Sequence, residues 1–140
     1  MKLKSAYIEM EDVTTLYLNK GIKNLKFYGN GELIKTNMSS LKKLKSIYCY
    51  NMNNAEFISK NKNKYVKNLY LIYVHDVILN LNGFNGLQKI KLKDCDFDTV
   101  KMSNLKNIKK ADITNCTLKK SNFKSINKLI DFNNETNTWL

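Results

Sequence analysis

The chain has no proline, no arginine and a single histidine. Without proline, its turns must be made by glycine, asparagine and serine, which accept or stabilise turn conformations. One histidine excludes a metal site built on a histidine pair, and it excludes a relay of several histidines. Without arginine, the chain lacks the bidentate contacts that a guanidinium makes to phosphates and bases.

Long apolar runs are missing as well. No segment approaches the roughly 18 consecutive apolar residues of a transmembrane helix, and Met1–Asp12 lacks the apolar core of a secretory signal peptide. The three cysteines, Cys49, Cys95 and Cys116, are an odd number without C-x-x-C spacing. We therefore expect buried free thiols in a reducing, cytoplasmic compartment, with no metal and no membrane partner.

The residues that would form a catalytic centre are also absent. His75 follows an apolar segment and is expected to be a solvated residue rather than a catalyst. The segments 29–31 and 83–86 contain paired glycines but lack the Lys-Ser/Thr of a phosphate-binding loop, so we interpret them as turns. The chain is therefore predicted not to be an enzyme, with no catalytic residue, no cofactor and no small-molecule substrate.

What the chain does have is positive charge. All 24 of its basic residues are lysines, against 12 acidic residues, and the net charge is +12. Abundant lysine, asparagine and isoleucine are what an AT-rich genome produces through its codons, so codon bias and function both stay open as sources of the charge. A basic surface nevertheless attracts acidic proteins and nucleic acids.

A spacing of apolar residues recurs about every 21 residues, and such a fixed period is typical of a solenoid. Further copies begin near Ile22, Leu41, Val66 and Ile126. We expect one domain over 1–140, with an N-terminal β cap at 1–20 and about six repeats at 21–140, the last of them capping. The best two copies are Phe84, Leu87, Ile90, Leu92, Cys95 and Leu105, Ile108, Ala111, Ile113, Cys116.

Each repeat is expected to contain one short strand. Ile90 and Leu92 alternate with lysines, which is the period-two pattern of a strand with one buried face. The second halves of the repeats, such as 98–107 and 119–128, are too short for a long helix and are expected to be extended or 3₁₀ segments. The sequence therefore predicts a parallel β-solenoid.

The register of these apolar positions resembles the leucine-rich repeat family over about Ile22–Leu140. The resemblance implies a solenoid that binds proteins, and the short repeats themselves predict that it is thin and gently curved. From Ile90 the chain also divides into five-residue steps, with Cys95 and Val100 next in the series. That division resembles the pentapeptide-repeat family, whose fold is a right-handed β-helix. Both alternatives stay open, and both are parallel solenoids.

The strand positions between the buried ones point outward, and tyrosines and lysines occupy many of them. Cross-strand packing is one reason for tyrosines there. Recognition is the other, because tyrosine is enriched where proteins bind one another. The residues that we expect at a partner-binding surface are Tyr28, Tyr48, Tyr50, Tyr70, Ile72, Tyr73, Lys89, Lys91, Lys93 and Lys110.

Three hypotheses for function follow. In the first, the chain is a protein-interaction module whose tyrosines contact a partner protein with an acidic surface. In the second, lysines neutralise the phosphates of a nucleic acid while tyrosines stack on its bases. In the third, the chain is a small inhibitor that occupies the surface of a nucleic-acid-handling enzyme. Self-association through the tyrosines also stays open.

Overall fold

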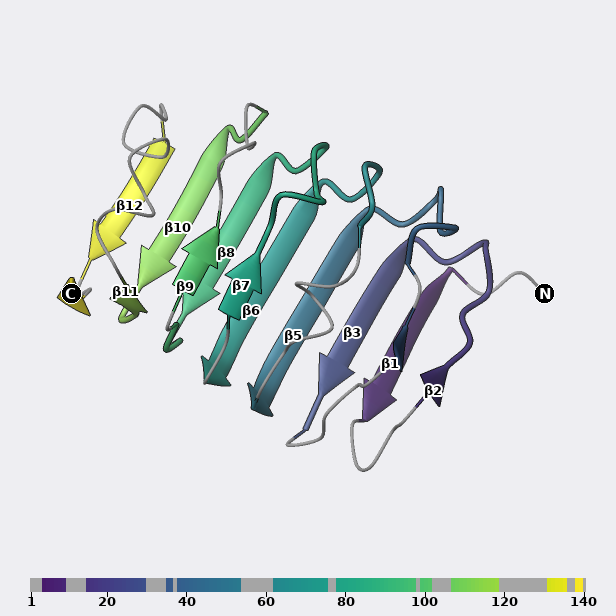
Figure 1. The fold of residues 1–140 in the computed structure, drawn as a ribbon, viewed down its shortest axis with the longest axis horizontal. Coiled ribbons are helices and arrows are strands. Elements are labelled where there is room, and N and C mark those ends of the chain that lie inside the picture. The colour runs from purple at the N-terminus through teal and green to yellow at the C-terminus, as the bar shows by residue number, and fades with distance from the viewer. Residues whose placement is uncertain are drawn as a thin grey trace.

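The structure is a computed structural model in which the chain winds into a stack of coils (Figure 1). It describes residues 4–9, 15–29, 35–36, 38–53, 62–75, 78–97, 99–101, 107–118, 131–135 and 138–139. None of the described residues is helical. The strands pair in parallel throughout, so the fold is a parallel β-solenoid, as the repeat predicts.

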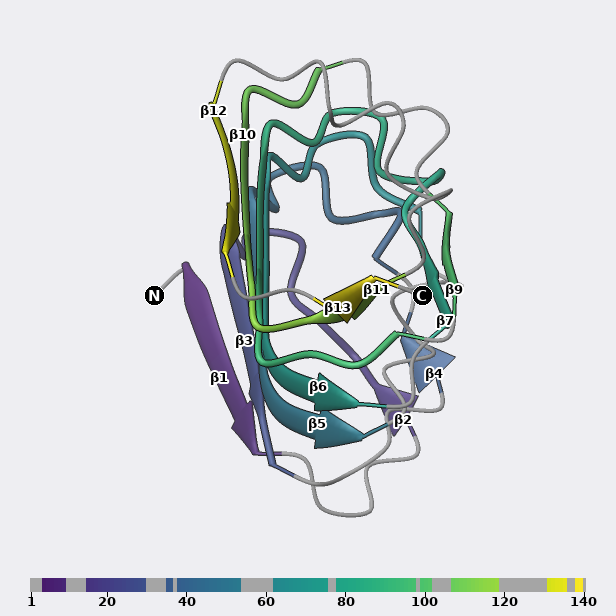
Figure 2. The ribbon, with the colours of Figure 1, turned by 90° about the vertical axis from the view of Figure 1, so that its left-hand side faces the viewer.

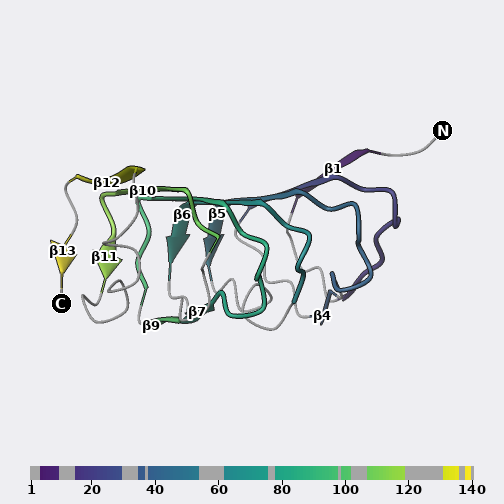
Figure 3. The same cartoon turned by 90° about the horizontal axis from the view of Figure 1, so that it is seen from above.

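One long strand from each coil enters a seven-stranded main sheet with the order β1-β3-β5-β6-β8-β10-β12. Shorter strands lie on the other sides of the coils and pair as β2 with β4, β7 with β9, and β11 with β13. Figures 2 and 3 show β7 and β9 across the core from the main sheet. The bounds are β1 (Ser5–Glu9), β2 (Thr15–Leu16), β3 (Asn24–Tyr28), β4 (Lys35–Thr36), β5 (Ser46–Asn53), β6 (Asn68–His75), β7 (Ile78–Asn80), β8 (Lys89–Lys93), β9 (Thr99–Lys101), β10 (Lys110–Thr114), β11 (Thr117–Leu118), β12 (Asp131–Glu135) and β13 (Thr138–Trp139).

The main sheet is stacked in register, so equivalent residues of successive coils lie beside one another. Leu25 pairs with Ile47, Ile47 pairs with Leu69, and each of these pairs joins residues that are one sequence repeat apart. Two columns of side chains therefore face the core. They are Ala6, Leu25, Ile47, Leu69, Ile90, Ala111 and Ile8, Phe27, Cys49, Leu71, Leu92, Ile113.

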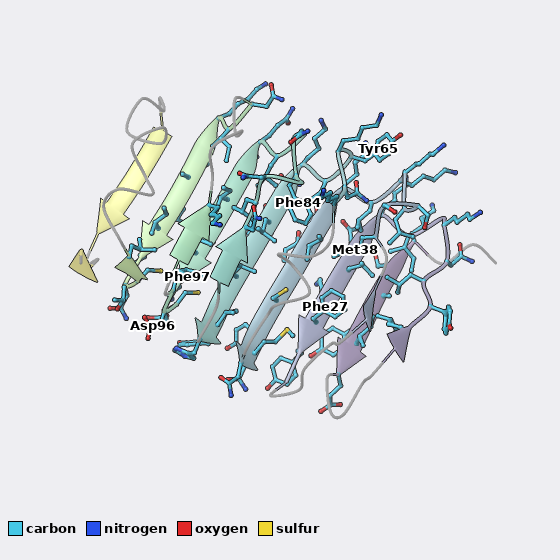
Figure 4. All side chains as sticks on the ribbon, in the orientation of Figure 1. Phe27, Met38, Tyr65, Phe84, Asp96 and Phe97 are labelled. Atoms are coloured by element: carbon cyan, nitrogen blue, oxygen red, sulfur yellow. The ribbon has the colours of Figure 1, made fainter. Side chains whose placement is uncertain are left out.

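The core is one continuous cluster that runs along the stack. Figure 4 labels Phe27, Phe84 and Phe97, which are among its largest fully buried side chains. Burying one such side chain contributes about 1.5–3 kcal/mol, so the fold depends on apolar contact between coils. All three cysteines are buried and free, as predicted. The predicted core positions 105, 126 and 129 lie outside the described residues.

The N-terminal strands predicted as a cap form the first coil of the stack. β1 pairs in parallel with β3, and the step from Ala6 to Leu25 is shorter than the step from Leu25 to Ile47. This shorter step explains why the segment does not match the repeat found in the rest of the chain. Ala6, Ile8, Leu16 and Leu18 are half-buried and pack against the core from this end.

The second halves of the coils are described only in part. Thr99–Lys101 is extended, as expected, and it pairs with β7 of the preceding coil. The segment 119–128, for which the sequence predicts the same conformation, lies outside the described residues.

In five strands of the main sheet, β3, β5, β6, β8 and β10, the outward residue that ends the flat part of the strand is followed by a residue with a left-handed backbone. There the chain leaves the main sheet for the adjoining side, and Figure 2 shows β5 and β6 bending at this corner. The left-handed region suits glycine, asparagine and aspartate, and it is strained for a bulky side chain. The residues and their φ angles are Gly29 (113°), Asn51 (54°), Tyr73 (54°), Asp94 (51°) and Asn115 (52°). Tyr73 is the exception among them.

Two glycines form the turn before β8, and both allow a close approach to the preceding coil. A Cβ on Gly86 would collide with the backbone carbonyl oxygen of Lys64. A Cβ on Gly83 would lie 2.6 Å from Cγ of Lys62, which rotation of that side chain can move, and 3.1 Å from its Cα, a milder backbone approach than the one at Gly86. The turns predicted at these glycines are thus confirmed, and the structure adds the reason why Gly86 has no side chain.

Gly86→Ala should lower the free energy of unfolding by about 2 kcal/mol or more, because the backbone of residue 64 cannot move without separating two coils. Gly83→Ala is the matched control and should cost clearly less, since the Lys62 side chain can rotate away. Urea unfolding followed by circular dichroism measures both values. Equal costs for the two variants would contradict this packing.

Candidate binding surface

The outward side chains of the main sheet form two columns that run along the stack. The first column contains Tyr7, Lys26, Tyr48, Tyr70, Lys91 and Asp112. The second contains Glu9, Tyr28, Tyr50, Ile72, Lys93 and Thr114. We call Tyr7, Tyr28, Tyr48, Tyr50, Tyr70, Ile72 and Tyr73 the tyrosine face.

The rings of the tyrosine face stack on one another from strand to strand. Tyr48 and Tyr70 have ring centroids 4.5 Å apart and planes within 6°. Tyr28 and Tyr50 are 5.4 Å apart and within 13°. Because the flat sides of these rings cover each other, the two columns present mainly ring edges and hydroxyl groups to solvent.

Two further tyrosines extend these stacks. Tyr7 stacks on Tyr28 with centroids 6.2 Å apart, and it is 67% exposed. Tyr73 meets Tyr50 edge-on at 5.6 Å and 86°. Tyr73 is among the residues that the sequence predicts at this surface, whereas Tyr7 belongs to the segment predicted as the cap. The alternation of Ala6 and Ile8 was the signal that Tyr7 points outward.

A groove of about 250 Å³ lies between the two tyrosine columns. Lys26 and all members of the tyrosine face except Tyr73 line it, and Phe27 and Cys49 reach it from the core side. Tyr28 is 37% exposed, whereas Tyr48 and Tyr70 are half-buried. Burial raises the pKa of Tyr70, and the neighbouring Tyr48 adds to the rise. The sheet therefore exposes an apolar groove that carries hydroxyl groups and one ammonium group at its rim.

The charges near the groove are less uniform than the sequence indicated. The Lys26 ammonium lies 5.4 Å from the centroid of the Tyr48 ring, in a cation–π contact. Lys91 forms an ion pair with Asp112 at 3.2 Å, and Nζ of Lys93 lies 4.0 Å from the Asp94 carboxylate. Two of the four lysines expected to extend the surface are thus partly neutralised.

The other two lysines expected at this surface, Lys89 and Lys110, are neighbours in register at the start of β8 and β10. Both are exposed. All ten residues predicted from the sequence therefore lie on the main sheet or at its corner. They form a tyrosine-rich part on β3, β5 and β6 and a mixed-charge part on β8 and β10.

Other kinds of site find no support in the part of the chain that the structure describes. There, no three His, Cys, Asp or Glu side chains gather closely enough to hold a metal ion. Within the same residues, no helix has the length and apolarity that crossing a membrane requires. His75 is exposed at the end of β6.

No protein-family model matches the chain, and neither a curated protein nor a solved structure is similar enough to count as a match. The function must therefore be inferred from the geometry of the chain itself.

The backbone strain at Tyr73 can be measured with two substitutions that both remove the ring. Tyr73→Asn introduces a residue that accepts the left-handed conformation, whereas Tyr73→Val introduces a β-branched residue that does not. We expect the Asn variant to be more stable than the Val variant by about 1 kcal/mol or more. Urea unfolding of both variants measures the difference. Equal stabilities would show that the backbone at residue 73 is not left-handed.

Proposed function

We propose that the chain is a non-enzymatic protein-interaction module, and that its tyrosine face binds a partner protein. The observation that carries the proposal is the apolar groove of about 250 Å³ between the two outward columns of the tyrosine face. Exposed apolar patches of this kind usually have a partner in proteins, and tyrosine is among the residues that contribute most to binding. Solenoids commonly bind through such extended strand surfaces.

Tyr73 favours recognition over simple cross-strand packing. Stacking within the columns accounts for Tyr28, Tyr48 and Tyr50 without any partner. Tyr73 also packs edge-on against Tyr50, but it does so from a left-handed corner position where other coils have glycine, asparagine or aspartate, so its ring contact comes with a backbone cost that the stacked tyrosines do not have. Strained residues of this kind are concentrated at functional sites, where a contact offsets their cost.

The charge at the groove supports a partner with acidic residues beside its apolar anchor. Lys26 lines the groove, and Lys89 is exposed at the start of β8 in the mixed-charge part of the surface. Complementary charges at the rim of an interface increase the association rate and suppress wrong partners more than they add affinity.

The stacking geometry favours a protein over a nucleic acid at this face. A base binds to the flat side of an aromatic ring, and in the pairs Tyr48–Tyr70 and Tyr28–Tyr50 the rings already cover each other. Ring edges and hydroxyls instead suit the side chains and backbone of a protein. The resemblance to leucine-rich repeats, whose domains mostly bind proteins, points the same way and stays a prediction.

The test combines capture of a partner with removal of its proposed contacts. The immobilised chain is incubated with a lysate treated with nuclease, and the captured protein is identified and purified. Its affinity is then measured for the wild type and for the double variant Tyr48→Ala, Tyr70→Ala. We expect a loss of about 100-fold or more, since two tyrosines of a binding hot spot contribute about 2 kcal/mol each.

The matched control is Tyr17→Ala with Tyr65→Ala, which removes two tyrosines outside the face and should change the affinity by less than about threefold. Circular dichroism establishes that both double variants are folded. Equal losses in the two variants, or capture that nuclease abolishes, would reject the proposal.

A further inference from the structure

A row of lysines runs along one edge of the solenoid, where the chain enters the strands of the main sheet. Lys4, Lys23, Lys45, Lys67 and Lys109 occupy the equivalent position of their coils, and Gln88 occupies it in the remaining one. We call these five lysines the lysine row. It contains none of the residues that line the tyrosine groove.

Backbone hydrogen bonds fix this alignment from coil to coil. The amide of Lys23 donates to the carbonyl oxygen of Lys4 at 2.8 Å, and the amide of Lys45 donates to that of Lys23 at 2.7 Å. Lys67, Gln88 and Lys109 continue the series, each donating to the preceding member at 2.8 Å. Neighbouring strands lie about 4.8 Å apart, so the six positions span about 24 Å.

The row is electrostatically unfavourable by itself. Like charges directly opposite each other on neighbouring strands destabilise a sheet. Lys4, Lys23, Lys45 and Lys109 are exposed, Lys67 is half-buried, and none of the five has an ion-pair partner among the described residues. By contrast, the column that contains Lys91 places Asp112 on the neighbouring strand and forms an ion pair. Codon bias would raise the number of lysines, but it would not align them at one position of successive coils.

A second set of lysines borders the row. Lys20, Lys42 and Lys64 stand three residues before Lys23, Lys45 and Lys67. Lys42 and Lys64 line a hollow of about 540 Å³ together with Lys62 and amide side chains such as Asn80 and Asn85. Figure 4 shows Tyr65, which also lines the hollow, at the upper edge of the view among side chains that end in nitrogen. No carboxylate is among the described lining residues.

The floor of this hollow is held in place by a buried amide. Asn63 is 3% exposed, and its Nδ2 donates to the carbonyl oxygens of Met38 and Leu41 at 2.6 and 3.2 Å. Its Oδ1 accepts from the amides of Tyr65 and Val66 at 2.8 and 3.2 Å. These bonds tie the turn that contains Lys42 to the turn that contains Lys64, so the bordering ammonium groups project from a fixed backbone.

We propose that the lysine row binds the phosphate backbone of a nucleic-acid strand without regard to its base sequence. A linear series of ammonium groups matches a linear series of phosphates, and lysine binds phosphate as a point charge. The described residues at this edge include no arginine for base contacts, so the binding is electrostatic. The site is separate from the tyrosine face, and either can fail without the other.

The test measures the affinity of the full chain for a labelled 20-nucleotide oligo-dT by fluorescence anisotropy between 50 and 200 mM salt. Each phosphate neutralised on a single strand contributes about −0.7 to the slope of log K against log salt. Five contacts therefore predict a slope of about −3.5. Replacing Lys23, Lys45, Lys67 and Lys109 with Gln should bring the slope to about −0.7 and weaken binding at 50 mM salt by about 30-fold or more.

The charge-matched control replaces Lys26, Lys89, Lys93 and Lys101 with Gln, which also removes four positive charges from the net +12. It should keep most of the slope. If both variants lost affinity and slope equally, the binding would depend only on the overall charge, and the proposal would be overturned. Absence of binding to oligo-dT at 50 mM salt would also overturn it, as would equally tight binding of poly-glutamate through the same lysines, which would make the ligand an acidic polypeptide.

The melting temperature of the lysine-row variant shows whether it is folded, so a loss of binding can be told apart from misfolding. Removing stacked like charges should raise the melting temperature of the lysine-row variant at low salt, and the gain should shrink at high salt as the charges become screened. A lower melting temperature at low salt would show that the lysines stabilise the fold, and it would overturn the argument that their stacking requires a ligand.

Discussion

The constraint on which this molecule depends is the in-register stacking of its coils. A parallel sheet with one strand per sequence repeat places each side chain beside the equivalent side chain of the next coil. Apolar residues therefore meet apolar residues in two inward columns, and the fold needs neither a disulfide nor a helix within the described residues. The same register aligns the outward positions, so a residue type that recurs at one position of successive repeats forms a row on the surface.

Repetition on the outside produces two different surfaces. On the main sheet it stacks tyrosines and encloses an apolar groove. At the edge where the strands begin, it stacks lysines, which repel one another. Stacked aromatic rings stabilise one another, whereas stacked like charges need a counter-charge. We therefore propose that the two surfaces bind different classes of partner. A chain with both would hold a protein beside a nucleic acid.

Much of this architecture can be predicted from the sequence, because the apolar positions repeat. Leu69, Leu71 and Val74 match the same frame as Ile90, Leu92 and Cys95, and all six are buried. Once these residues face inward, alternation alone places Tyr48 and Tyr70 outside. Other features depend on which coils become neighbours. Tyr7 lies in a first coil whose step to the next is shorter than the others, and the ion pair of Lys91 with Asp112 exists only because β8 and β10 are adjacent.

The left-handed backbone of Tyr73 could not be predicted from the sequence either. Asn51, Asp94 and Asn115 suit that conformation, but a tyrosine gives no such signal, and only the backbone reveals the strain at Tyr73. The lysine row was hidden for a related reason. Lysines are abundant throughout the chain, so their alignment becomes visible only when backbone hydrogen bonds specify which of them stack.

The segment Tyr48-Cys49-Tyr50 tests the register most directly, because a slip of one residue would exchange its buried and exposed side chains. Cys49 faces the core, where burial raises the pKa of its thiol, while Tyr48 and Tyr50 point outward. The measurement is mass-spectrometric footprinting of the folded chain by tyrosine nitration and cysteine alkylation. Both tyrosines should react, and Cys49 should be alkylated only after unfolding. Rapid alkylation of Cys49 with protected tyrosines would contradict this register.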